Sequence, residues 1–492
     1  MNLGEQLKRR KPIVFTKLHH AGQELSRNLS TFQLTMFGVG ATVGTGIFFV
    51  LGEAVPKAGP AVLISFLVAG LAAGLSALCY AEMASAIPVS GSTYSYSYHA
   101  LGEGVAVVIA GCVLLEYGVA TGAVAVGWSS YFNELTHSLL GVRLPHALSI
   151  SPIPGTDGLA TGGIINLPAV ILIFLCSLLL IRGASESARL NAIMVIIKLG
   201  VLVLFSVIGF SAFQADHFQG FFDSGFAGIS AAAGTIFFSF IGLDAVATAG
   251  EEVKDPQKAL PRAIIAALVI VTTVYVLVAG AGLAAKHASF FSSPEAAEAG
   301  LAQILKDITG NEFWSTVLAA GAVISIFSVT LVSLYGQTRI LFSISRDGMV
   351  SRKFIEVNPR TMTPVYNTIV VSIVVALIGG FVPADYLWDT VSIGTLVAFS
   401  VVAIGIIVLR RTAPDLERPF KLPGYPVTPI LTVAACAWIM WGLSAVTWLI
   451  FGVWIAIVFL FYLVYGRQHA ILNHYSDPEE IAEPLGREDE KP

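Results

Sequence analysis

Long apolar runs recur along this chain and are separated by short polar stretches. Many runs hold about 20 residues without Lys, Arg, Asp or Glu, the length at which a helix crosses the roughly 30 Å hydrocarbon core of a bilayer. The pattern predicts an all-α polytopic membrane protein. Twelve membrane spans are expected, near residues 32–51, 61–80, 104–126, 164–181, 190–213, 226–249, 263–284, 314–335, 365–383, 389–409, 428–446 and 447–465.

The last two spans are inferred from length. No charged residue occurs between Ile430 and Gly466. Because a helix rises 1.5 Å per residue, a helical segment of that length is far too long for a single crossing. We therefore expect the chain to turn back near Gly442.

Composition supports the membrane class, since only 12% of the 492 residues are charged, against roughly 25% in soluble domains. If both termini lie on one side, that side receives 23 Lys and Arg residues. The positive-inside rule then predicts cytoplasmic termini in a cell inner membrane, with both polar tails mobile. The opposite side receives four basic residues, which are Lys57, Arg143, Lys286 and Lys306.

Two of the expected spans are rich in glycine near their middle. Breaking a helix in lipid leaves main-chain N–H and C=O groups unpaired, which is tolerated only around a buried polar site. Glycine-interrupted spans at matching places in two halves indicate a transporter with inverted repeats. A packing motif of the Gly-x-x-x-Gly type is the alternative for span one. The glycines are Gly38, Gly40, Gly44 and Gly46 in span one, and Gly234 and Gly242 in span six.

The polarity of such breaks suits a zwitterion. The N-terminal end of a half-helix offers free N–H groups to an anion, and unwound carbonyls suit a cation. An amino acid carries both charges. The two breaks therefore predict an amino acid site.

Four motifs resemble the amino acid–polyamine–organocation superfamily, and within it the cationic amino acid transporter family in its bacterial twelve-helix form. The likeness covers about residues 25–465. One departure is Met349-Val350, where relatives often carry Leu-Pro. The motifs are GVGATVGTGIF (38–48), YAEMASAIPVSGSTYSYSYHALGE (80–103), FFSFIGLDAVATAGEEVKDPQKALP (237–261) and YGQTRILFSISRDGMV (335–350).

The resemblance implies a leucine-transporter-like fold with a 5+5 inverted repeat, in which helices 1 and 6 are discontinuous. It also implies how the chain is organised. The implied parts are a cytoplasmic N-terminal segment (1–30), a ten-helix transport core (31–410), helices 11 and 12 (411–466) and a cytoplasmic C-terminal tail (467–492).

Carried over residue by residue, the resemblance implies two groups of substrate contacts. The first break would hold the substrate carboxylate through main-chain N–H groups and the Thr45 hydroxyl. The second would hold the α-amino group through main-chain carbonyls, with the Phe238 ring covering the site. The residues are Val43, Thr45 and Gly46 at the first break, and Phe238, Ser239 and Ile241 at the second.

Lys198 lies about 12 Å into span five. A lysine at mid-helix costs ~2.5–3.5 kcal/mol on insertion scales, so its presence calls for a reason. Snorkelling to the interface is one alternative. The resemblance implies another, in which the ammonium stands where relatives bind sodium, between the first break and span eight. Lysine, unlike arginine, can release its proton near physiological pH, so Lys198 is the predicted proton-coupling group and no sodium site is expected.

Three further polar residues lie within spans. Glu116 matches a third-span glutamate typical of the cationic subfamily and would face a substrate cation, with a structural carboxylate as the alternative. Ser333 would leave room for a long side chain such as that of arginine, although small residues in membrane helices often serve packing. Asp244 is either a structural acceptor or a proton carrier.

A cluster of charges follows span six. It is either a solvated helix exit or an inner gate that pairs with Arg339 or Arg346. The cluster consists of Glu251, Glu252, Lys254, Asp255 and Arg262.

Together these features predict a secondary active, proton-coupled amino acid transporter that works by alternating access and imports arginine, lysine or ornithine. A symporter of small neutral amino acids and an exchanger are the alternatives. No His-Glu-x-x-His or nucleophile elbow indicates an enzyme, and no motif indicates nucleic-acid binding. The four cysteines lie singly, so no metal or other cofactor is expected, and a small membrane partner or a homo-oligomer is left open.

Overall fold

The computed structural model describes residues 2–12, 27–142, 144–154, 162–292, 294–441 and 445–474. This part of the chain is helical apart from turns and two isolated β-bridges, so the all-α prediction is confirmed. The helices are α1 (Leu3–Lys8), α3 (Thr31–Thr42), α4 (Thr45–Ala58), α5 (Val62–Ala86), α6 (Ser92–Ala100), α7 (Glu103–Leu140), α8 (Leu167–Arg182), α9 (Ala184–Ser211), α10 (Gly225–Phe237), α11 (Ala245–Thr248), α12 (Pro256–Ala285), α13 (Pro294–Thr309), α14 (Glu312–Arg346), α15 (Val365–Phe381), α16 (Ala384–Thr412), α17 (Val427–Trp441), α18 (Ala445–Phe461) and α19 (Arg467–His469).

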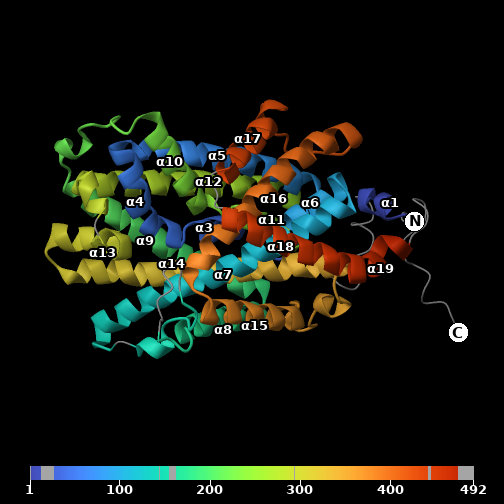
Figure 1. Cartoon of the computed structure of the whole chain (residues 1–492), viewed down its shortest axis with the longest axis horizontal. Helices are drawn as coiled ribbons and strands as arrows, with labels where there is room; N and C mark the ends of the chain where they lie inside the picture. The colour runs from blue at the N-terminus through green and yellow to red at the C-terminus, as the bar shows by residue number, and fades with distance from the viewer. Residues whose placement is uncertain are drawn as a thin grey trace.

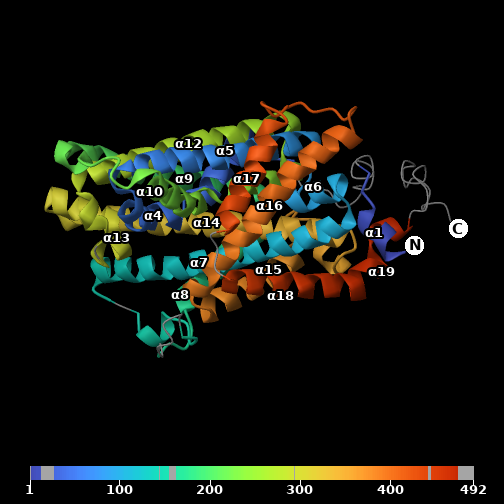
Figure 2. The ribbon, with the colours of Figure 1, turned by 45° about the horizontal axis from the view of Figure 1, so that its top comes forward.

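Most of the long helices run along the long axis of the molecule (Figure 1). Helices α1 and α19 lie together at one end, which we call the terminal end, and α13 lies at the opposite, distal end (Figures 1 and 2). The interrupted helix formed by α3 and α4 packs between α9, α12 and α14 in the interior. This arrangement surrounds the glycine-rich breaks with protein.

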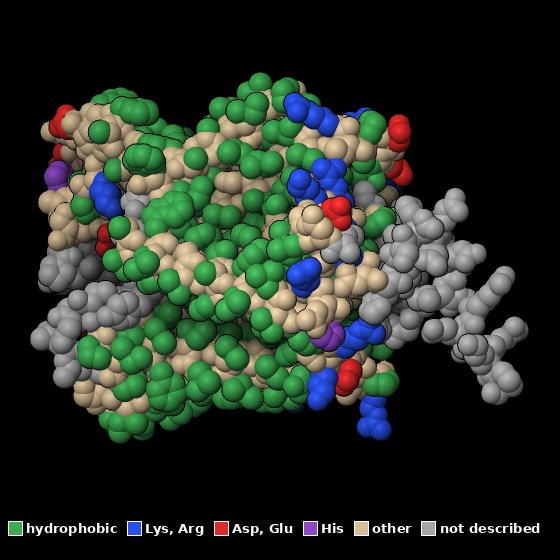
Figure 3. Space-filling view, turned by 45° about the vertical axis from the view of Figure 1, so that its right-hand side comes forward, with side chains coloured by type: hydrophobic (Ala, Val, Ile, Leu, Met, Phe, Trp, Pro, Cys, Tyr) green, Lys and Arg blue, Asp and Glu red, His purple; other side chains and the backbone are tan. Residues whose placement is uncertain are grey.

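The surface has the character of a membrane protein. Eight helical stretches in the described residues are long and apolar enough to cross a bilayer, and α8, α15 and α17 are shorter apolar helices. Large apolar side chains such as Leu71, Trp441 and Leu449 are more than half exposed. Figure 3 shows a broad hydrophobic belt, with Lys and Arg side chains gathered toward the terminal end. The chain is a multi-span membrane protein.

Each of the twelve expected spans coincides with a helix or an interrupted helix. The count of twelve crossings and the inverted repeat stay predictions. The expected turn near Gly442 falls outside the described residues.

Both glycine-rich helices are discontinuous. Helix α3 ends at Thr42 and α4 begins at Thr45, with Gly44 between them at φ −132° and ψ −141°. Helix α10 ends at Phe237, and after a 3₁₀ turn the chain passes Gly242 at φ +108°. Only glycine adopts that φ readily. The predicted breaks in spans one and six are therefore present.

The N-terminal segment is not a mobile tail throughout, as the sequence suggested. Residues 2–12 pack on the terminal end, where Arg9 pairs with Glu103 at 2.7 Å and Lys11 pairs with Asp347 at 2.6 Å. Both carboxylates are almost completely buried, and a buried carboxylate is stable only when it is paired. Polar composition alone does not reveal such partners, so the expectation of mobility was wrong for this part of the tail.

Two other helices were not expected. Helix α6 lies between spans two and three, and α13 lies between spans seven and eight and contacts α4 and α14. Neither is a long apolar run, so neither resembles a membrane span. Their positions bring α6 to the terminal end and α13 to the distal end (Figure 1).

Candidate functional site

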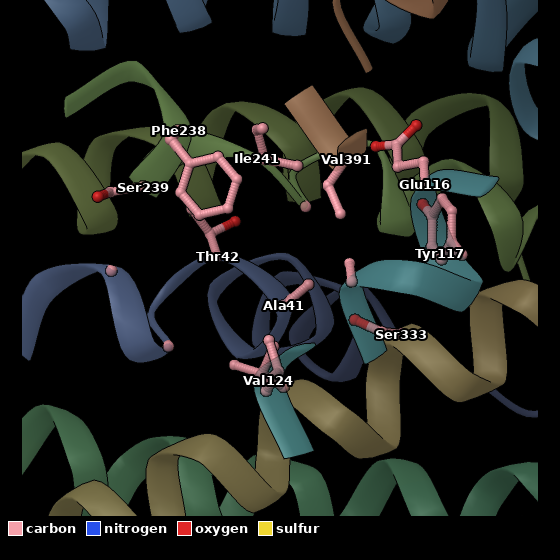
Figure 4. Close-up of a pocket in the computed structure, with 15 residues that line it drawn as sticks. Ala41, Thr42, Glu116, Tyr117, Val124, Phe238, Ser239, Ile241, Ser333 and Val391 are labelled. Carbon is pink, nitrogen blue, oxygen red and sulfur yellow. The ribbon is translucent and has the colours of Figure 1, made fainter. Parts of the chain in front are cut away.

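A pocket lies where the two interrupted helices meet, with α7, α14 and α16 completing its walls. Figure 4 shows Phe238 over the pocket, Glu116 and Tyr117 together on α7, and Ser333 on α14 below Tyr117 in this view. Most of the lining is apolar. The lining residues are Ala41, Thr42, Gly44, Gly46, Glu116, Tyr117, Ala120, Val124, Phe238, Ser239, Ile241, Gly242, Val329, Ser333 and Val391.

Six of the eight predicted substrate residues line this one pocket, although they come from four separate helical segments. Val43 does not line it, because its carbonyl is turned toward α9 and α14. Thr45 begins α4, and its side chain is not part of the described structure. The six are Gly46, Glu116, Phe238, Ser239, Ile241 and Ser333.

The first break is packed so closely that side chains are excluded. A Cβ atom on Gly46 would lie 2.6 Å from the Ser239 hydroxyl oxygen, and one on Gly44 would lie 2.6 Å from a methyl group of Val329. The main chain itself therefore forms the pocket wall. Since the first N–H groups of a helix have no partner within it, the start of α4 offers donors to an anion.

The second break holds a buried hydroxyl beside carbonyls that each accept one hydrogen bond. The Ile241 N–H donates to the Phe238 carbonyl at 3.2 Å, which closes the 3₁₀ turn. The Ser239 hydroxyl is buried and has no hydrogen-bond partner among the described residues. A buried hydroxyl in that state is available to a ligand.

Lys198 is completely buried and binds the first break from behind. Its ammonium donates to the Gly40 carbonyl at 2.9 Å and to the Val43 carbonyl at 2.6 Å, and Ser328 of α14 lies 3.5 Å away. Within the described residues it forms no salt bridge. The snorkelling alternative does not describe this side chain. Main-chain oxygens surround its charge, as oxygen ligands surround a bound metal cation.

Two buried carboxyl groups lie beside the pocket. Glu116 is almost fully buried and lines the pocket (Figure 4). Asp244 is outside the lining, where it accepts a hydrogen bond from the Tyr117 hydroxyl at 2.5 Å. Its other oxygen has no partner among the described residues. Of the two carboxyl groups, Glu116 is thus the one that borders the substrate space.

Part of the charge cluster after span six forms ion pairs with α14. Glu252 pairs with Arg339 at 2.5 Å and accepts from the Tyr335 hydroxyl at 2.7 Å. Glu251 forms a two-point pair with Arg346, at 2.6 and 2.8 Å. Arg339 and Arg346 are the two residues with which the charge cluster was expected to pair if it forms an inner gate. The other cluster members, Lys254, Asp255 and Arg262, take no part in these pairs.

Sequence reasoning missed several residues that support the breaks. Tyr275 of α12 donates toward the carbonyls of Thr42 and Ser239, each 2.9 Å away. Asn191 of α9 donates to the Met36 carbonyl at 3.1 Å. A tyrosine or an asparagine in an apolar helix gives little signal by itself. Only the three-dimensional arrangement shows which oxygens they meet.

Comparison with known proteins gives consistent matches over nearly the whole chain. The chain is 41% identical over 453 residues to a branched-chain amino acid permease of Bacillus subtilis, covering 92% of this chain and 95% of that protein. It is 40% identical over 466 residues to a methylthioribose transporter of Bacillus subtilis, covering 94% and 99%. A vacuolar cationic amino acid transporter of Arabidopsis thaliana is 36% identical over 424 residues, covering 84% and 64%.

The fold and the pocket define a multi-span membrane protein with two interrupted helices around one cavity. Residues 29–471 match the amino acid permease family, and the chain belongs to this family within the amino acid–polyamine–organocation superfamily. The resemblance seen in the motifs is confirmed. The relatives are transporters and permeases, which also confirms that the chain is not an enzyme.

Proposed function

We propose that this chain is a proton-coupled amino acid importer that works by alternating access in the cell membrane, with both termini in the cytoplasm. The observation that carries the proposal is that the breaks of two interrupted helices meet at one pocket, where the start of α4 lies beside the Ser239 hydroxyl, which has no partner within the described part of the chain. The N–H groups at the start of α4 suit a carboxylate, and the carbonyls near Ser239 suit an ammonium group.

The substrate that the pocket fits best is an amino acid with a neutral, apolar side chain. Beyond the two breaks the walls are apolar, and Val124, Val329 and Val391 contribute three of the lining side chains. Burial of a substrate's apolar side chain there contributes about 25 cal/mol per Å². A relative of 41% identity that is named for branched-chain amino acids supports this choice.

Cationic amino acids are the second candidate. Glu116 lines the pocket, the small Ser333 side chain in the same lining leaves space, and relatives near 35% identity are named for cationic substrates. The first candidate is preferred because most of the described lining residues are apolar and Glu116 is the one acidic side chain among them.

We assign proton coupling to Lys198. The protonated ammonium satisfies the carbonyls of Gly40 and Val43, and loss of the proton would weaken both contacts. Opening of the site to either side would then bind or release the proton along with the substrate. The ammonium takes the place of a coupling cation, so the proposal includes no sodium site.

Uptake into proteoliposomes tests the proposal. Labelled leucine should accumulate under an inward proton gradient and should only equilibrate without one, and unlabelled arginine should compete weakly. In Lys198→Met we expect gradient-driven accumulation to fall at least tenfold, because methionine cannot carry a proton. Accumulation of leucine by this variant as in the wild type would remove the coupling assignment. Strong accumulation of arginine, lost in Glu116→Gln, would instead support the second candidate.

A further inference from the structure

Tyr275 connects the two broken helices from outside the pocket. It lies on α12, is fully buried and does not line the pocket. Its hydroxyl is 2.9 Å from the carbonyl of Thr42, the last residue of α3, and 2.9 Å from the carbonyl of Ser239, in the turn after α10. One side chain therefore reaches the unpaired ends of both interrupted helices.

The Tyr275 hydroxyl matters because it is a donor shared by two carbonyl groups. A tyrosine hydroxyl carries a single proton, so the two carbonyls share one donor. Carbonyls at a helix end lack partners within the helix, and a buried carbonyl without a donor is costly. The ring packs at the edges of Phe66 and Phe240, with centroids 6.1 and 5.2 Å away. The hydroxyl thus sets the separation between the two breaks.

The same short segment of the first break is held from the other side by Lys198. The Lys198 ammonium binds the carbonyls of Gly40 and Val43, and Tyr275 binds that of Thr42 between them. A change in the protonation of the lysine alters the contacts on one side of this segment. If the first break then moves, Tyr275 would move the Ser239 turn with it, because its hydroxyl contacts the carbonyls of both Thr42 and Ser239.

The Ser239 turn in turn touches the start of α4. The Ser239 hydroxyl lies so close to Gly46 that a Cβ there would be 2.6 Å from it. A shift of this turn therefore reaches both the carbonyls proposed for the substrate's ammonium and the N–H groups proposed for its carboxylate.

We infer that Tyr275 is a positioning residue that ties the two helix breaks together and transmits the protonation state of Lys198 to the substrate site. The inference rests on the proposed function and adds to it a residue that contacts neither the substrate nor the proton. A residue in this role controls how strongly substrate affinity depends on pH.

The test compares Tyr275→Phe with the wild type in proteoliposomes and in detergent. Phenylalanine keeps the ring contacts and removes only the hydroxyl. We expect the KM for labelled leucine to rise about fivefold to tenfold, in line with the loss of one shared hydrogen bond. We also expect the dependence of leucine binding on pH between 5.5 and 8.5 to flatten. The melting temperature in detergent reports separately on folding.

Two control variants distinguish positioning from simple loosening of the core. Tyr462→Phe removes another buried hydroxyl, which bonds to Glu103 at the terminal end, and should leave KM and the pH profile unchanged. Phe66→Leu loosens the packing around Tyr275 but keeps its hydroxyl, and should lower the melting temperature without flattening the pH profile.

The outcomes separate the inference from the proposed function. Wild-type protein that takes up neither leucine nor arginine contradicts the proposed function, whatever Tyr275 does. Wild-type protein that accumulates leucine, together with a Tyr275→Phe variant of unchanged KM and pH profile, overturns the inference alone. A flattened profile in Phe66→Leu as well would also overturn it, because packing and not the hydroxyl would then set the pH dependence.

Discussion

Individual glycines decide where the main chain becomes the wall of the pocket. Gly46 and Gly234 were both counted among the glycines of the broken spans, yet their surroundings differ. A Cβ on Gly46 would lie 2.6 to 3.1 Å from three atoms of Ser239, including a main-chain atom. A Cβ on Gly234, within α10, would meet nothing within 4 Å. Of these two glycines, Gly46 is the one at which the two helix breaks are in close contact.

Gly46→Ala should therefore abolish most transport, whereas Gly234→Ala should be tolerated. We expect leucine uptake to fall at least tenfold in Gly46→Ala, because the Ser239 turn must move to admit the methyl group. Gly234→Ala should keep uptake within about twofold and gain up to ~1 kcal/mol of helix stability. Initial uptake rates and melting temperatures of the two variants check this. Equal loss in both would mean that the whole of span six, and not its contact with Gly46, is sensitive.

The sequence indicated some site residues and not others for physical reasons. Lys198 stood out because a charge within an apolar run is costly. Gly44 and Gly242 stood out because glycine weakens a helix. Tyr275 did not stand out, since most of a tyrosine side chain is apolar and its hydroxyl matters only through the carbonyls it reaches. Val391 lines the pocket, but in the sequence it is one apolar residue among many in its span, and only the packing of the helices gives it this position.

At the level of elements, the N-terminal segment docks onto α6 through a buried histidine. The His99 Nδ1–H donates to the Lys11 carbonyl at 2.6 Å, and the side chain is almost fully buried. Burial disfavours the charged imidazolium and, aided by the nearby Lys11 charge, lowers the pKa of His99 from 6.5 to about 4. Burial therefore keeps His99 neutral in the folded state near neutral pH.

This lowered pKa predicts an acid-sensitive contribution to stability. The unfolded state binds the His99 proton near pH 6.5 and the folded state only near pH 4. The contribution is therefore complete above about pH 6.5 and is lost as the pH falls toward 4. His99→Gln, which can still donate to the Lys11 carbonyl but does not titrate, should lose less stability than the wild type in this window. Melting temperatures at pH 7.5, 6, 5 and 4.5 measure the difference, and parallel curves would contradict the prediction.

At the scale of the whole molecule, the spans were predictable and their assembly was not. A helix of about 20 apolar residues matches the thickness of a bilayer core, so the hydropathy pattern was enough to predict where each membrane span lies. Helices α1, α6 and α13 escaped notice because they lie outside the long apolar runs and are held by contacts with distant segments. One such contact is the pair between Arg9 and Glu103, which are 94 residues apart. Such pairing exists only in the folded chain.

Two ion pairs join the exit of span six to α14, and in the proposed alternating-access mechanism they would have to separate. The Glu251–Arg346 pair is the more exposed of the two, at roughly a tenth for each side chain, so it is the better place to attach a cross-link. The four native cysteines are all buried and should not compete for a thiol reagent.

In the double variant Glu251→Cys/Arg346→Cys, a bifunctional thiol reagent about as long as the two side chains should hold the exit of span six to α14. Leucine uptake should fall to background after treatment and return when the reagent is cleaved. Each single variant, treated in the same way, controls for modification without cross-linking, and both should retain uptake. A cross-linked protein that still transports would mean that the substrate leaves by a path that does not open between span six and α14.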